Sequence, residues 1–229
     1  MVGRRGGRVK KPLDHDAIVD KALELLARDG LPGMSLRSVA KALDTGPASL
    51  YVYVSDLQAL HALVLDRALA SVSLRVARDK PWRERLEAVL ASYYRVLFRH
   101  RGLAQLAMST IAAGPNALRL IETLLGILDD GGIDETSAAW AVDLLMLYVT
   151  SIAFEQSQRA VDGDDPLANV ARAIGQVSAS EHPRVHRARE ALLSGDGSAR
   201  FSWALHVLLE GILRVPTHTP RKTKTRRTA

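Results

Sequence analysis

The sequence predicts an all-α fold in two parts: an N-terminal three-helix unit of the helix-turn-helix type and a larger C-terminal helical domain. Apolar residues recur every three to four positions in successive segments, and no segment has the alternation of a strand. Gly, Pro and small polar residues separate these segments. A chain of 229 residues can bury a substantial core, so each part can have its own.

The first predicted helix supports the two that follow it. Asp14 can cap its start and Gly30 can end it. One face of the segment is apolar, as expected of a helix that packs on one side. That face comprises Ile18, Ala22, Leu25 and Leu26.

Two short helices joined by a tight turn are predicted next. Ser35 can cap the first, which ends at Asp44-Thr45-Gly46, and Pro47 suits the first turn of the second. In the second helix Leu50 and Val54 share the inner face. Two helices across such a turn form a helix-turn-helix, whose second helix enters the major groove of DNA. The same spacing also suits a corner used for packing alone.

The outward-facing residues of this corner favour DNA binding. Ser49, Tyr51 and Tyr53 are predicted to face outward, and exposed aromatic area tends to mark a contact site. Arg37, on the preceding helix, could reach a base edge or a phosphate. The predicted DNA-binding residues are Arg37, Gly46, Pro47, Ala48, Ser49, Tyr51 and Tyr53.

At these residues the chain resembles the TetR family of transcriptional repressors. The resemblance runs from Ile18 to about Leu65 and includes SLRSVAKAL and PASLYVYV. The segments from Trp82 to Leu86 and at His100-Arg101 are similar to later segments of the tetracycline repressor branch. The resemblance implies a ligand-responsive, sequence-specific repressor that binds a double-stranded DNA operator as a homodimer and is released by a small-molecule effector.

Two residues depart from the family pattern. Asp44 stands where glycine is usual in the turn, and aspartate tolerates the left-handed conformation less well than glycine. Leu57 stands where a lysine is often found, so one expected phosphate contact is missing.

A long helix is predicted to begin at Ser55, which has capping-box spacing with Gln58, and to run to about Asp79. Its first turns would pack under the second short helix and its later turns would enter the C-terminal domain, so it is the expected mechanical link. Further helices are predicted at about 82–100, 103–112, 116–129 and 135–160. A weaker helix that ends at about residue 177 follows, and then helices at about 184–193 and 199–213.

The helices at 135–160 and 199–213 are apolar nearly all round, more than one packed face needs. They are either central core helices of a monomer or helices shared between the core and a second subunit. The resemblance favours the second interpretation, because TetR-like repressors dimerise through a bundle of their last two long helices. A dimer also reads two half-sites about 34 Å apart, whereas one short helix reads too few base pairs.

An effector cavity in the C-terminal domain is implied by the resemblance. Buried Tyr and Trp need hydrogen-bond partners, and a few polar groups among apolar walls are typical of small-molecule sites, although each residue could equally be part of the core. Near Ser73 and Ala107 the tetracycline repressor has its drug and magnesium histidines, so no metal is predicted here. The predicted effector-binding residues are Tyr93, Tyr94, Phe98, Ala107, Thr110, Trp140 and Tyr148.

The net charge of +6 belongs to the ends of the chain. Residues 1–13 and 216–229 each carry five Lys or Arg, and removing these ten charges leaves a net charge of −4. Such segments can add salt-dependent attraction to phosphates. The expected division is therefore a basic arm at 1–13, a DNA-binding domain at 14–60, an effector-binding and dimerisation domain at 61–215 and a basic tail at 216–229.

Several function classes find no support in the sequence. Zero cysteines exclude disulfides and thiol chemistry, and no nucleophile, phosphate-binding or metalloprotease motif is present, so we expect neither an enzyme nor a cofactor. No secretory leader or membrane-spanning segment is evident, which favours a cytoplasmic protein without a membrane partner. Two alternatives stay open: an architectural DNA-binding protein without an effector, and a helical ligand-binding protein or enzyme.

Overall fold

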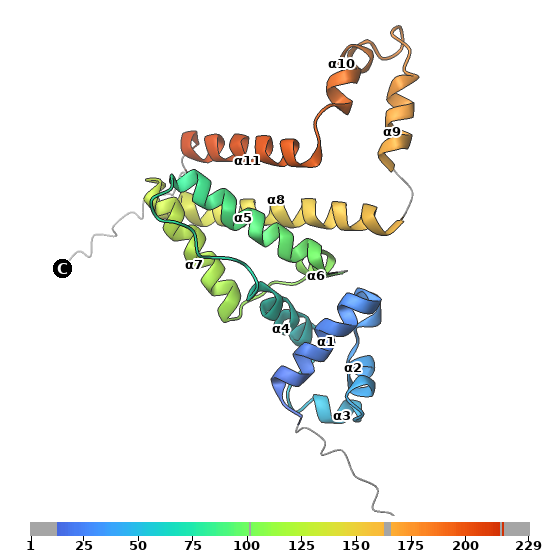
Figure 1. Ribbon diagram of the computed structural model, residues 1–229, viewed down its shortest axis with the longest axis vertical. Helices are drawn as coiled ribbons and strands as arrows, with labels where there is room; N and C mark the ends of the chain where they lie inside the picture. The colour runs from blue at the N-terminus through green and yellow to red at the C-terminus, as the bar shows by residue number, and fades with distance from the viewer. Residues whose placement is uncertain (1–12, 101, 163–165, 216, 218–229) are drawn as a thin grey trace, which may run out of the picture.

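The computed structural model describes residues 13–100, 102–162, 166–215 and 217 (Figure 1). Within these ranges the chain forms helices and no strand, which confirms the all-α prediction. A short 3₁₀ turn at Leu31–Gly33 follows the first helix. The α-helices are α1 (His15–Asp29), α2 (Leu36–Ala42), α3 (Pro47–Leu50), α4 (Leu57–Leu69), α5 (Trp82–Arg99), α6 (Leu103–Ser109), α7 (Pro115–Asp130), α8 (Glu135–Asp162), α9 (Pro166–Gly175), α10 (Pro183–Leu193) and α11 (Gly197–Arg214).

Helices α1 to α3 form the small unit at one end of the molecule (Figure 1). The predicted caps are confirmed: Asp14 accepts from the Ala17 amide at 2.7 Å, and Ser35 forms a capping box with Ser38. Between α2 and α3 the backbone of Asp44 has φ 53°, the left-handed region where glycine is favoured. The turn therefore adopts the conformation for which the family glycine is suited, with aspartate in its place.

Helix α4 connects the small unit to the larger domain, but both of its predicted ends are wrong. Its cap is Asp56, which accepts from the Ala59 amide at 2.8 Å, and not Ser55. It ends at Leu69 rather than near Asp79, where the amides of residues 70–72 bond three residues back instead of four, and the Ser73 amide donates to the Ser92 hydroxyl of α5 at 2.8 Å. That bond holds an irregular segment against α5, so the link between the two parts is a helix of 13 residues.

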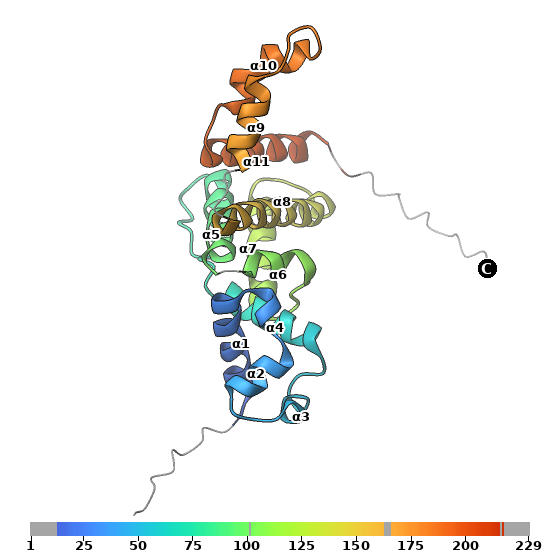
Figure 2. The same cartoon turned by 90° about the vertical axis from the view of Figure 1, so that its right-hand side faces the viewer.

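The larger domain is built around α8, which packs against α5, α6 and α7 and lies beside α11 (Figures 1 and 2). Residues 135–159 of α8 are long and apolar enough, by length and composition, to cross a membrane. In the structure this stretch packs against four helices of the same chain.

Helices α9 and α10 pack on each other and stand off the rest of the molecule (Figures 1 and 2). The basic arm up to residue 12 and most of the basic tail lie outside the described residues, as do residues 163–165 between α8 and α9.

Candidate functional site

The first candidate site is the exposed tip formed by α3 and the residues around it. Leu50 and Val54 are buried, as predicted, and fix α3 on the small unit. Two residues between them face outward: Tyr51 is 57% exposed and Val52 is 81% exposed. The other exposed predicted residues at this end are Arg37, Gly46, Pro47, Ala48 and Ser49.

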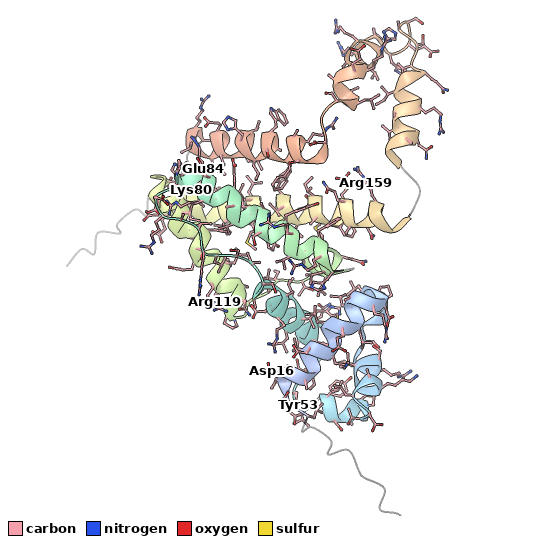
Figure 3. The ribbon with its side chains drawn as sticks, in the orientation of Figure 1. Asp16, Tyr53, Lys80, Glu84, Arg119 and Arg159 are labelled. Carbon is pink, nitrogen blue, oxygen red and sulfur yellow. The ribbon has the colours of Figure 1, made fainter. Side chains whose placement is uncertain are left out.

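The prediction that Tyr53 faces outward is wrong, because its side chain packs against the start of α1. It is half-buried, its hydroxyl donates to the Leu13 carbonyl at 2.8 Å, and its ring meets His15 edge-on with centroids 5.4 Å apart (Figure 3). The spacing could have shown this, since Tyr53 lies three residues after buried Leu50 and shares its side of the helix. Tyr53 thus ties the tip to the start of α1.

The second candidate site is a cavity of about 460 Å³ that is open to solvent on one side and is lined by α4 to α8 and by residues 110–112. Its walls are mainly apolar, with a few hydroxyl groups. The Tyr93 hydroxyl and the Thr150 hydroxyl are hydrogen-bonded at 2.8 Å, and burial raises the pKa of Tyr93. The buried Thr110 hydroxyl has no hydrogen-bond partner among the described residues, so it can bond a ligand. Asp143 is the only charged side chain of the lining within the described ranges.

The predicted effector-binding residues divide among three places. Tyr93, Ala107 and Thr110 line the cavity. Trp140 does not, since it is 65% exposed on the side of α8 that faces α11. The remaining three, Tyr94, Phe98 and Tyr148, belong to an aromatic cluster around Phe201 of α11, where the Tyr94 hydroxyl also bonds Gln156.

The structure adds cavity residues that the sequence did not single out. Leu65 and Leu69 come from α4, so the connecting helix forms part of the cavity wall. Both side chains are buried, but the spacing could not show whether they faced a filled core or an open space. Thr150 was missed because a lone threonine in an apolar helix carries no signal until its partner, Tyr93, is known.

A third surface is the exposed apolar side of α8 and α11. Trp140 is 65% exposed and Trp203 is 69% exposed, and Leu144, Leu147 and Val207 are exposed on the same two helices. Exposed apolar area of this extent on adjacent helices is typical of a protein interface.

Helix α4 also contacts the small unit directly. Arg67 forms ion pairs with Asp16 and with Asp20 of α1, the second at 3.4 Å. His61, on the same helix, is buried, and its Nε2 has no hydrogen-bond partner in the described part of the chain. Burial lowers the pKa of His61 below its ordinary value of 6.5. The same helix therefore borders both the cavity and the small unit.

The chain is similar in sequence to a described protein family and to known regulators. The family model described as "Tetracyclin repressor-like, C-terminal domain" matches residues 77–215. An HTH-type transcriptional regulator of Saccharopolyspora erythraea is 32% identical over 213 residues, which are 90% of this chain and 86% of that protein. The class C tetracycline repressor of Escherichia coli is 27% identical over 212 residues, 87% of this chain and 90% of that protein.

One solved structure is similar to this chain over most of the length of both proteins. ActR of Streptomyces coelicolor, a TetR family protein solved in complex with actinorhodin, has a TM-score of 0.82 and 32% identity. The match covers 89% of this chain and 98% of that chain. The helix-turn-helix, the helical second domain and these relatives lead to one conclusion: the chain belongs to the TetR family of DNA-binding transcriptional regulators.

Proposed function

We propose that this chain is a homodimeric repressor that binds an operator duplex through the α3 tip and is released when a small-molecule effector fills the cavity. One observation supports it above the others: α4 forms part of the cavity wall and also pairs with α1 of the DNA-reading unit. A ligand in the cavity therefore contacts the helix that positions the tip.

At the tip, the exposed residues are the proposed DNA contacts. Ser49 and Tyr51 can reach base edges or phosphates, Arg37 adds a charged contact, and Gly46, Pro47 and Ala48 let the backbone approach the groove closely. Tyr53 has an indirect role, because its hydroxyl is bonded to Leu13 and holds the tip on α1.

Dimerisation is proposed through the exposed apolar side of α8 and α11, marked by Trp140 and Trp203. Pairing two copies there would form a four-helix bundle and cover apolar area that a single chain leaves in water. It would also present two tips to one face of a duplex, as reading two half-sites requires.

The effector is proposed to be a mainly apolar molecule held by the hydroxyl groups of Tyr93, Thr110 and Thr150. ActR, with 32% identity, has been solved with actinorhodin bound, which supports a drug-sized organic ligand for this fold. No histidine lines the cavity within the described ranges, so magnesium-chelated tetracycline would lack its imidazole ligands. Calorimetry with magnesium and tetracycline should show no tight binding, and tight binding would overturn this part.

One experiment distinguishes a repressor from the two alternative functions. Duplexes are selected from a random library by the full-length protein and then measured by fluorescence anisotropy with wild type and Tyr51→Ala. A repressor selects one motif with two half-sites, and Tyr51→Ala binds it about 5- to 150-fold more weakly for each half-site, because a good base contact contributes about 1 to 3 kcal/mol. An architectural protein selects no motif. A ligand carrier or enzyme binds no duplex at physiological salt.

We also propose that the protein acts by binding alone and works in the cytoplasm, where an operator is accessible. Catalytic activity is not needed for the switch, since an effector only has to bind the DNA-free conformation better than the DNA-bound one. A coupling of about 1 to 3 kcal/mol changes DNA affinity about 5- to 150-fold.

A further inference from the structure

Asp66 of α4 makes an unusual set of contacts with α7. Its side chain is buried, and its Oδ1 accepts from the amides of Asn116 at 3.0 Å and Ala117 at 2.9 Å. Its Oδ2 accepts from the Asn116 side chain at 2.9 Å. The two amides belong to the first turn of α7, where backbone N–H groups have no partner within the helix. The start of α7 is therefore capped by a carboxylate from another helix, where a negative charge is favourable.

Gly114 makes room for this cap. It occupies the N-cap position of α7, where a serine or aspartate would ordinarily bond the first-turn amides, and it has no side chain to do so. A Cβ at this position would lie 2.3 Å from Cγ of Asp66, which is too close. The backbone of Gly114 has φ −81°, which any residue can adopt, so glycine is needed here for space and not for conformation.

The cap lies between the cavity and the DNA-reading unit. Leu65 and Leu69, on either side of Asp66 in the sequence, line the cavity, and so does Ala117 of the capped turn. The segment from Thr110 to Ala112 lines it as well and leads directly into Gly114. On the other side, Arg67 contacts α1 through an ion pair with Asp16. Adjacent residues of α4 thus contact α7 and α1.

We propose that the Asp66 carboxylate is the coupling group of this regulator: it ties α4 to α7, so that α4 follows when a ligand moves residues 110–117. The inference rests on the proposed function, because it assigns the regulation of the same cavity. Without the cap, α7 and its preceding segment could adjust to a ligand while α4 kept its place. Coupling between two sites is reciprocal, so DNA binding must in turn alter residues 110–117.

This reciprocity allows a test without a known effector. Hydrogen exchange of residues 110–117 is measured in the full-length protein, free and bound to the duplex selected from a random library. In wild type we expect DNA to change their exchange about fivefold or more. If no duplex can be selected, the proposed function fails and the coupling fails with it. If a duplex binds and the exchange of residues 110–117 is unchanged, only the coupling role of Asp66 is overturned.

Two variants separate coupling from simple stabilisation. In Asp66→Ala with Gly114→Ser, the new serine supplies a local cap for α7 but does not reach α4. We expect the double variant to bind the selected duplex while the exchange response of residues 110–117 falls below about twofold. If the cap only stabilises α7, the restored cap restores the response, and that result would overturn the proposal.

The second variant keeps Asp66. Gly114→Ala places a methyl group where the carboxylate lies, so it should displace Asp66 and remove the response in the same way. Asp130→Ala is the matched control, because it removes a carboxylate contact at the other end of α7, a 2.8 Å ion pair with Arg85 of α5. The control should keep the wild-type response. A response that persists in both test variants would also overturn the proposal.

Discussion

Tyr53 shows how one side chain connects two parts of the DNA-reading unit. Its hydroxyl donates to the Leu13 carbonyl, and its ring packs against His15. Tyr53→Phe keeps the ring and removes this bond, so we expect the free energy of unfolding to fall by about 1 kcal/mol, the usual net contribution of a hydrogen bond. Urea denaturation followed by circular dichroism measures it. An unchanged midpoint would mean that the bond contributes nothing in solution.

His61 makes stability depend on pH. Burial lowers its pKa from 6.5, so the unfolded chain binds the proton more readily than the folded one. The free energy of unfolding that depends on neutral His61 is therefore fully present above about pH 6.5 and is lost as the pH falls below that value. His100, whose pKa burial and Arg99 also lower, acts in the same direction.

We therefore expect the free energy of unfolding to decline between about pH 7 and 5, and less steeply in His61→Leu than in wild type. Leucine also removes a buried nitrogen that has no partner among the described residues, so the variant should be at least as stable at pH 7.5. Urea titrations of both proteins across this range provide the measurement. Parallel pH profiles would rule out His61 as a source of the dependence.

At the scale of single helices, sequence patterns predicted most of the fold because caps and apolar spacing are local signals. The starts of α1, α2 and α3 follow from Asp14, Ser35 and Pro47. The end of α4 could not be predicted in the same way. The segment after it is held by a bond between the Ser73 amide and the Ser92 hydroxyl, 19 residues apart, and such a contact is visible only in the folded chain.

The effector cavity was harder to predict than the helices that enclose it. Tyr93 and Tyr94 are neighbours in α5, about 100° apart around the helix axis, and only Tyr93 faces the cavity. Because α8 is apolar nearly all round, spacing cannot tell which of its faces meets a cavity, which meets α11 and which stays exposed. Trp140 is the clearest case, since its large apolar side chain lies at the surface.

At the scale of the whole molecule, DNA affinity should depend on the α8 and α11 surface. Trp203→Glu places a charge on a side chain that is 69% exposed in one chain and covered in the proposed dimer. We expect a folded monomer in analytical ultracentrifugation at micromolar concentration. Its operator affinity should fall about 100-fold or more, since half the contacts are lost.

Leu118→Glu on α7 is the matched control, because Leu118 is also exposed, at 58%, but lies outside the α8 and α11 surface. It should stay dimeric and bind the operator as wild type does. A dimeric Trp203→Glu would argue against this interface, and a monomeric wild type would argue against dimerisation itself.

The basic arm allows a prediction about long-range electrostatics, although its residues lie outside the described ranges. Residues 1–11 carry five Lys or Arg, and the arm joins the described chain at Leu13, whose carbonyl accepts from Tyr53 beside the α3 tip. A basic segment joined to the chain at this point can meet phosphates next to the recognition helix. Each phosphate contact that the arm makes steepens the fall of log affinity with log salt by about 0.9.

Deleting residues 1–11 should therefore flatten the salt dependence of operator binding, measured by anisotropy between about 50 and 200 mM salt, the range over which phosphate contacts dominate affinity. Deleting residues 218–229 is a control matched in charge, because it also removes five Lys or Arg, but from the end of the chain that follows α11. This segment follows α11, and α11 lies away from α3 in Figure 1. The slope should change in the first deletion and not in the second. Equal changes would mean that the arm acts only through net charge, and an unchanged slope would remove it from operator binding.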